Sequence, residues 1–195
     1  MKTEIEVKFL DINIAEMREK LKDAGAQLEQ PMRLMKRALI ETPETNARHA
    51  YLRIRNEGDK ITATFKQFTE NSLTGAKERE IVVSDFDETI AIFAEFGLHY
   101  HTFQESKRET WRCGDVEVVI DEWPWINPYI EIEGDSEKAV KQAAKELGFT
   151  WSDAVFGSVD VIYNLVYPDM TVRGVIDIEE VRFGEDVPRE FGGRA

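Results

Sequence analysis

Pairs of acidic residues at alternating positions are the feature of this sequence best suited to chemistry. They occur on three segments that alternate charged and apolar residues: Glu4 and Glu6, Glu78 and Glu80, and Glu131 and Glu133. Successive side chains of a strand point to opposite faces of a sheet, so each pair shares one face. Carboxylate oxygens are the ligands that Mg²⁺ and Mn²⁺ prefer. The pairs therefore predict a site for a hard divalent cation.

Basic residues gather on strand faces in the same way. Arg53 and Arg55 share one face of a segment over residues 51–55, and Lys66 lies with two threonines on the segment that follows. Lys8 shares its face with the first acidic pair. Guanidinium groups bind phosphate oxygens in a two-pronged geometry, and ammonium groups bind them as point charges. These faces predict contacts with phosphate groups.

A solvated strand face is the ordinary explanation of any one of these patterns. Two observations weaken this explanation: the pattern recurs on several strands, and acidic and basic residues occupy different strands. An exposed face favours mixed charges, with opposite charges across from one another. If the sheet curls so that these faces point inward, its lumen holds six carboxylates and Asp121, with Lys8, Arg53, Arg55 and Lys66. Burying so many charges without water or counter-ions would cost several kcal/mol per ion. The lumen therefore predicts a bound metal–polyphosphate complex.

The elements that must position these faces are short strands separated by a few helices. Alternation predicts strands over residues 4–10, 34–41, 51–55, 61–68, 78–83, 103–111, 116–122 and 128–133. Helical spacing predicts helices over residues 13–24, 86–96 and 136–147, and a short one over 159–166. Most strands are spaced as in hairpins. The predicted fold class is therefore α+β, an antiparallel barrel of roughly eight strands with helices packed on its outside.

Composition and charge argue against several other classes of protein. The chain has 195 residues, 42% of them apolar, which predicts one domain with a sizeable core. A net charge of −13 argues against nucleic-acid binding, although a local basic pocket can still bind a small polyanion. No apolar run approaches the roughly 20 residues that span a bilayer, and no signal peptide is evident. Cys113 is the single cysteine and cannot form an internal disulfide. We expect a cytoplasmic protein without a membrane partner.

Taken in order, the charged motifs resemble those of the CYTH superfamily, the triphosphate tunnel metalloenzymes. The motifs that carry the resemblance are Glu4-x-Glu6-x-Lys8, Leu52-Arg53-Ile54-Arg55, Thr64-Phe65-Lys66, Glu78-x-Glu80, Lys107-Arg108, Asp121-Glu122 and Glu131-Ile132-Glu133-Gly134. The resemblance implies an eight-stranded antiparallel tunnel domain over residues 1–170. Residues 171–195 would then be a partly disordered C-terminal extension, with residues 170–183 forming either an extra strand or an interface segment.

The resemblance also implies roles for individual residues. The expected ligands of Mg²⁺ or Mn²⁺ are Glu4, Glu6, Asp121, Glu131 and Glu133. The expected triphosphate-binding residues are Lys8, Arg37, Arg53, Arg55, Lys66 and Arg108. The catalytic candidates are Glu4, Glu6, Lys8, Lys66 and Glu80. Among them Lys8 or Lys66 would stabilise the leaving phosphate oxygen, and the general base stays open between the three carboxylates.

Three functions fit this resemblance. The first is metal-dependent hydrolysis of a small-molecule triphosphate, either inorganic tripolyphosphate or an organic triphosphate. The second is a class IV adenylyl cyclase, which makes cyclic AMP from ATP and would need an adenine pocket for which the sequence holds no motif. The third is a non-catalytic sensor of polyphosphate or nucleotide. Outward apolar sheet faces would pack on helices or on a second subunit, so a homodimer stays open.

Overall fold

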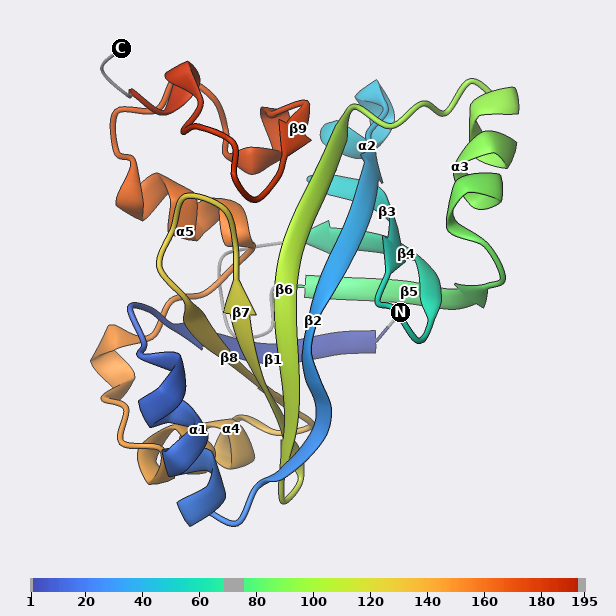
Figure 1. The fold of residues 1–195 in the computed structure, drawn as a ribbon. Coiled ribbons are helices and arrows are strands. Elements are labelled where there is room, and N and C mark those ends of the chain that lie inside the picture. Colours follow the sequence, from blue (N-terminus) through green and yellow to red (C-terminus); the bar gives the residue numbers. More distant parts are fainter. Residues whose placement is uncertain (1, 69–75, 193–195) are drawn as a thin grey trace.

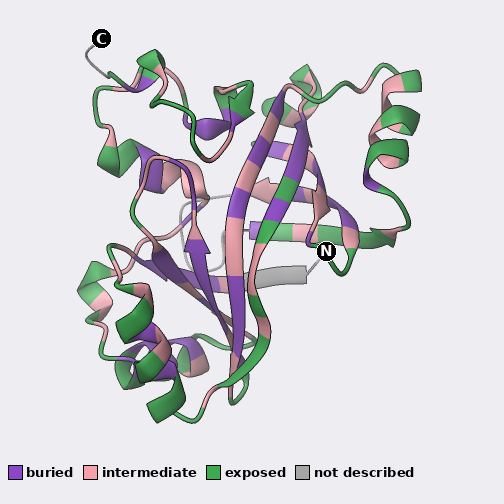
Figure 2. Ribbon diagram, viewed as in Figure 1, coloured by how far each residue is buried: buried purple, intermediate pink, exposed green. Residues whose placement is uncertain are grey.

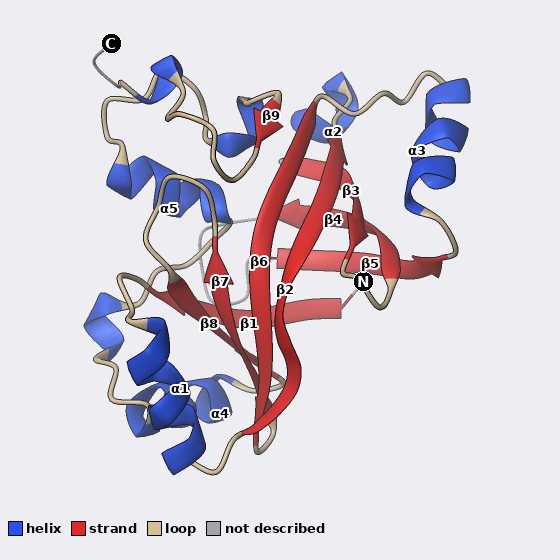
Figure 3. Cartoon of the chain, viewed as in Figure 1, coloured by secondary structure: helices blue, strands red, loops and turns tan. Residues whose placement is uncertain are grey.

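A curled antiparallel sheet forms the centre of the molecule, with helices around it (Figures 1 and 3). The computed structural model describes residues 2–68 and 76–192, without the side chains of residues 2–4. The strands are β1 (Lys2–Phe9), β2 (Gln27–Ile40), β3 (Ala50–Asn56), β4 (Ile61–Phe68), β5 (Ala76–Val83), β6 (Thr102–Cys113), β7 (Val116–Glu122), β8 (Tyr129–Gly134) and β9 (Glu180–Val181). The helices are α1 (Ile14–Asp23), α2 (Pro43–Asn46), α3 (Phe86–Glu95), α4 (Glu137–Glu146) and α5 (Val159–Val166), with 3₁₀ turns η1 (Trp151–Asp153), η2 (Val175–Asp177) and η3 (Arg189–Phe191).

Eight of the strands close into a ring. Their order is β2-β3-β4-β5-β1-β8-β7-β6, and a long antiparallel pairing of β2 with β6 joins the two ends. The short strand β9 pairs with β6 in parallel, outside the ring. The predicted α+β class and the eight-stranded antiparallel barrel with helices around it are therefore confirmed.

The strand boundaries differ from prediction mainly in β2. The alternation predicted a strand over residues 34–41, whereas β2 begins at Gln27. Residues 27–33 are polar or partly exposed and lack alternation, and they are held as a strand by pairing with β6 across two register shifts. The segment after β2 forms the single turn α2, which begins where the Thr42 hydroxyl accepts a hydrogen bond from Thr45 N.

Helices α1 and α4 cover the outer face of one half of the ring (Figure 1). Each begins at a side-chain cap, since Asn13 accepts a hydrogen bond from Glu16 N and Ser136 accepts one from Ala139 N. Their apolar stripes pack against the outward residues of β1, β7 and β8, such as Val7. Figure 2 shows the opposite faces of these helices exposed. The largest core of the protein therefore lies outside the ring.

A second cluster lies beneath α3. Phe86 and its partly buried neighbours Ile90 and Phe93 pack against Ala38 and Ile54 of the adjacent strands. Helix α3 is thus positioned on the outer face of the ring, as the sequence predicted.

The chain after α4 forms a third cluster at one end of the ring. Helix α5 spans the predicted residues 159–166, and its Tyr163 packs with Trp123 and Phe191. Residues 170–181 continue through η2 to the extra strand β9, one of the two alternatives for this segment. No helix among the described residues is long and apolar enough to cross a bilayer.

The outer core should supply most of the stability. Ile132 on β8 is fully buried against α1 and α4, so Ile132→Ala should lower the free energy of unfolding by about 2–5 kcal/mol. The matched change Ile81→Ala, on β5 where the side chain is 64% exposed, should change it by less than about 0.5 kcal/mol. Urea denaturation followed by circular dichroism measures both. Equal losses in the two variants would contradict this placement of the core.

Candidate functional site

A cavity of about 330 Å³ lies inside the ring of strands. All eight ring strands contribute to its lining, together with residues 158–160 at the start of α5. Its basic side chains are Lys8, Arg37, Arg53, Arg55, Lys66 and Arg108, and its acidic side chains are Glu6, Glu78, Glu80, Glu117, Glu131, Glu133 and Asp160. The polar strand faces therefore point inward, and the apolar faces pack on the helices outside.

Charges of opposite sign lie on opposite walls of this cavity. Arg37 on β2 pairs in register with Arg55 on β3, and Arg53 lies on the same strand. Around the ring, β1 lies four strands from β2 in either direction, and β8 lies four strands from β3. Strands β1 and β8 carry the acidic residues Glu6 and Glu131. A ligand in the cavity therefore meets a basic wall on one side and an acidic wall on the other.

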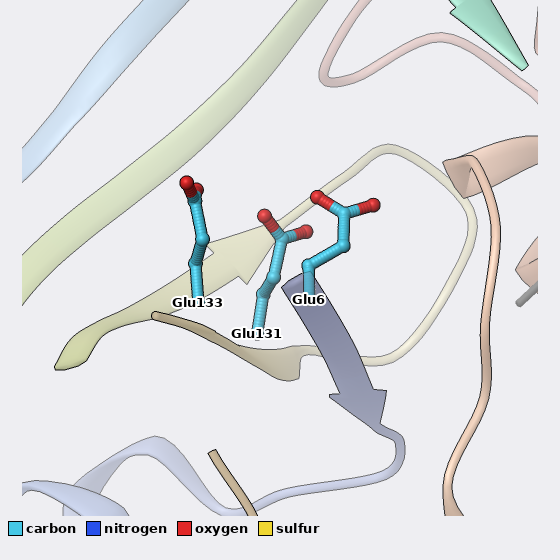
Figure 4. A group of neighbouring side chains, drawn as sticks. All are labelled: Glu6, Glu131 and Glu133. Atoms are coloured by element: carbon cyan, nitrogen blue, oxygen red, sulfur yellow. The ribbon is translucent and has the colours of Figure 1, made fainter. Parts of the chain in front are cut away.

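The acidic wall contains a group of three carboxylates suited to a metal ion. Glu6 from β1 and Glu131 and Glu133 from β8 point the same way (Figure 4). Each offers an oxygen atom, and the three atoms lie within 4.8 Å of one another. Register explains this arrangement, because Glu6 is the cross-strand partner of Glu133. Closely spaced, partly buried carboxylate oxygens are the donor set that hard divalent cations take.

Lys8 lies between two of these carboxylates. Its Nζ is 2.9 Å from Glu6 Oε1 and 3.2 Å from Glu131 Oε2. Burial lowers the pKa of Lys8, but Glu131 and Glu6 outweigh that effect and raise it above its usual value. Burial likewise raises the pKa of Glu131, and the charges of Lys8, Arg108 and Lys66 overcome it and lower the pKa to about 2. Both groups are therefore charged at neutral pH.

The arginines of the basic wall are buried close to one another. Burial and the neighbouring Arg53 and Arg55 lower the pKa of Arg37 to about 9. Burial and Arg53 also lower the pKa of Arg55 to about 10, despite an opposing contribution from Glu57. The Nε atoms of Arg37 and Arg55 are buried and have no hydrogen-bond partner in the described part of the chain. Such a wall favours an anion that carries several oxygen acceptors.

Arg108 differs from the other arginines because a carboxylate holds it. Its Nε and Nη2 donate to the two carboxylate oxygens of Asp121, at 2.7 and 2.6 Å. Burial lowers the pKa of Arg108, but Asp121 and Glu131 raise it well above the usual value. The adjacent Lys107 points outward and lies 4.6 Å from the centre of the Phe183 ring, so Arg108 is the inward residue of the two, as predicted. Asp121 therefore orients a basic side chain.

Lys66 and Glu80 extend the lining along β4 and β5. Lys66 Nζ lies 2.8 Å from Glu78 Oε1, and Glu80 accepts a 2.8 Å hydrogen bond from the Thr64 hydroxyl. Both contacts follow from register, in which Lys66 faces Glu78 and Thr64 faces Glu80. Arg79, between the two acidic residues, points to the opposite face of β5 and is exposed.

The cavity brings together most of the residues predicted from the sequence. All six expected triphosphate-binding residues line it, as do the expected metal ligands Glu6, Glu131 and Glu133 and the catalytic candidate Glu80. Asp121 is engaged by Arg108 instead of joining the carboxylate group. The backbone of Glu4 pairs with β5, but its side chain lies outside the described residues. The predicted roles themselves stay predictions.

Several lining residues were missed by the sequence reasoning. Glu117 shares its strand face with Asp121, so the same alternation could have placed it. Asp160 enters from the start of α5, where it accepts hydrogen bonds from Ser158 Oγ and Ile176 N. No local pattern marks Asp160, because the packing of the chain after residue 150 brings it to the cavity.

Comparison with known proteins identifies related sequences and folds. The CYTH domain model matches residues 2–153. The structure of the PH1012 protein from Pyrococcus horikoshii OT3 is similar with a TM-score of 0.66 and 22% identity, over 77% of this chain and 93% of that one. An adenylate cyclase candidate from Vibrio parahaemolyticus gives a TM-score of 0.68 and 13% identity, over 83% and 97%.

A third similar structure is HpAC1 from Hippeastrum, an adenylyl cyclase candidate described as having a dominant triphosphatase activity. Its TM-score is 0.56 and its identity 15%, over 87% of this chain and 98% of that one. At these identities the likeness shows the fold alone. No curated protein matches this chain.

Glu131 should stabilise the fold above acidic pH. Because its pKa is lowered from 4.5 to about 2 in the folded state, its contribution is complete above pH 4.5 and is lost as the pH falls towards 2. Glu131→Gln removes that contribution. We therefore expect the free energy of unfolding, measured in urea, to fall more steeply over this interval in the native chain than in the variant. The exposed change Glu137→Gln on α4 should keep the native slope, and identical slopes in all three proteins would contradict the assignment.

Proposed function

The chain belongs to the CYTH domain family, and we propose that it hydrolyses a small-molecule triphosphate with the help of Mg²⁺ or Mn²⁺. The observation that carries this proposal is one cavity whose described lining combines six basic side chains with a group of three carboxylates. A triphosphate bound to metal presents both partners that such walls require, phosphate oxygens for the basic wall and a cation for the acidic wall.

The carboxylate group fits a divalent metal in residue type and spacing. Glu6, Glu131 and Glu133 would hold the ion, and Glu4 stays a candidate ligand because the alternation of the sequence predicts that it shares a face with Glu6. A bound ion supplies positive charge to phosphate oxygens and lowers the pKa of coordinated water. Asp121 would serve in another way, by fixing the guanidinium of Arg108 toward the substrate.

The side chains of the basic wall would bind and orient the phosphate chain. Arg37, Arg53 and Arg55 lie side by side on β2 and β3, so they can contact successive phosphate oxygens. Lys8 and Lys66 carry charge at the border with the acidic wall, where they would stabilise the leaving phosphate oxygen. In phosphoryl transfer, positioning and charge neutralisation of this kind provide most of the catalysis.

A carboxylate must orient or deprotonate the attacking water. Glu6 and Glu131 are already held by the ammonium group of Lys8. Glu80 instead accepts a hydrogen bond from the neutral hydroxyl of Thr64, which leaves other lone pairs of its carboxylate available to a water molecule. Glu80 is therefore our candidate for the general base.

The proposal predicts metal-dependent release of orthophosphate. With Mg²⁺ or Mn²⁺, tripolyphosphate and water should give pyrophosphate and orthophosphate, which ³¹P NMR distinguishes. Glu6→Gln should remove a metal ligand and Arg55→Ala a phosphate contact, and each should lower kcat/KM by about 100-fold or more. The exposed change Glu137→Gln should leave the rate unchanged.

The same spectra decide between the three functions. ATP and thiamine triphosphate are tested beside tripolyphosphate to rank the hydrolysed substrates. Pyrophosphate together with cyclic AMP from ATP would replace the hydrolase by an adenylyl cyclase. Binding of tripolyphosphate without any product would favour a non-catalytic sensor and contradict the proposed activity.

A further inference from the structure

A buried acidic residue lies directly beyond the basic wall. Glu57 follows β3 in the turn that leads to β4, and it is only 4% exposed. Along β3 the lining of the cavity includes Tyr51, Arg53 and Arg55 at alternating positions. Glu57 is the next residue in that alternation, and it is not part of the lining. On this strand the row of positive charges therefore ends at a carboxylate.

Ionic contacts hold this carboxylate against the end of the row. Glu57 Oε1 lies 2.6 Å from Arg55 Nη2, the last arginine of β3. Its Oε2 lies 3.6 Å from Arg33 Nη2, and the ammonium of Lys60 is 3.7 Å from Oε1. Burial raises the pKa of Glu57, but Arg55 and Lys60 lower it below its usual value. Glu57 is therefore an anion at neutral pH.

Arg33 fixes the position of Glu57 from the side of β2. Arg33 Nε donates a 3.0 Å hydrogen bond to the Glu57 carbonyl, and its Nη1 donates to the Arg108 carbonyl and the Thr110 hydroxyl, both at 3.3 Å. Because these donors are engaged, Arg33 holds the turn that contains Glu57 in a fixed position. The carboxylate of Glu57 is therefore held in place before any ligand arrives.

We propose that Glu57 ends the phosphate-binding row and limits the length of the phosphate chain that the cavity accepts. A phosphate group that extended past Arg55 would meet a fixed negative charge in a partly desolvated position, where repulsion is poorly screened. The inference rests on the proposed function, since it concerns the substrate of the same cavity. It assigns to Glu57 the selection of tripolyphosphate over longer polyphosphates.

A purely structural role for Glu57 makes a different prediction. As a counter-ion, Glu57 reduces the repulsion among the buried arginines, and its loss would change the affinity for every polyphosphate by a similar factor. If Glu57 instead ends the row of arginines, its loss changes only the affinity for polyphosphates longer than tripolyphosphate. The ratio of two affinities therefore separates the two roles, whereas stability or a single affinity does not.

The test is isothermal titration calorimetry with pyrophosphate, tripolyphosphate and tetrapolyphosphate, in buffer with EDTA so that no metal-dependent turnover occurs. The variant is Glu57→Gln. The matched control is Asp59→Asn, which removes one negative charge from the same turn at an exposed position. We expect the ratio of Kd for tetrapolyphosphate to Kd for tripolyphosphate to fall by about tenfold in Glu57→Gln and to stay unchanged in Asp59→Asn.

The native chain gives a result of its own even if Glu57→Gln does not fold. Native protein that bound tetrapolyphosphate tenfold or more tightly than tripolyphosphate would overturn the inference without any variant. An equal ratio in the native chain and Glu57→Gln, with tripolyphosphate bound by both, would overturn the inference and leave the proposed function standing. Absence of tripolyphosphate binding to the native chain in EDTA would overturn the inference, and its absence both in EDTA and with Mn²⁺ would overturn the proposed function as well.

Discussion

The separation of positive and negative charge across a closed ring of strands is the constraint on which the rest of this structure depends. Partly buried charges are costly unless ions or water compensate them, and charges of opposite sign attract each other when they can meet. Here the pairing of β2 with β6 closes the ring and holds the arginines of β2 and β3 across from the carboxylates of β1 and β8. Contacts such as Lys8 with Glu6 and Glu131 satisfy part of the charge at the border. The remaining charge of each wall can therefore bind ions of the opposite sign.

The inward charge dictates where the hydrophobic core can form. A ring strand that turns its polar face inward can bury its apolar face only outside the ring, and the largest cluster packs there, beneath α1 and α4. The later part of the chain adds the cluster around Tyr163 at one end of the ring and brings α5 to the cavity. Only parts of the ring are covered in this way, and Ile81 and Val82 on β5 are largely exposed. The helices thus compensate for a barrel whose interior contributes little hydrophobic stabilisation.

Much of this arrangement could be predicted from the sequence, because the period of a strand assigns each side chain to a face. That rule requires Lys107 and Arg108 to lie on opposite faces, as they do, and it grouped Glu131 with Glu133 on the face turned toward the cavity. It is silent where the outcome depends on the partner strand. The resemblance implied a metal-ligand role for Asp121, which stays a prediction, and register sets Asp121 opposite Arg108, with which it forms a bidentate pair. Long-range packing likewise determines the first half of β2, the position of the Asp160 carboxylate and the position of Glu57. No local sequence pattern indicates such packing.

The most direct test of the charge-separated cavity is the melting temperature of the native chain with Mn²⁺, with an imido-bridged tripolyphosphate analogue that resists hydrolysis, and with both. The analogue alone should raise the melting temperature, because an anion relieves the repulsion between the buried guanidinium groups of Arg37 and Arg55 and the neighbouring Arg53. Both ligands together should raise it by more than the sum of the separate shifts, since each favours binding of the other across the cavity. A melting temperature that does not respond to the analogue, with or without Mn²⁺, would contradict the account.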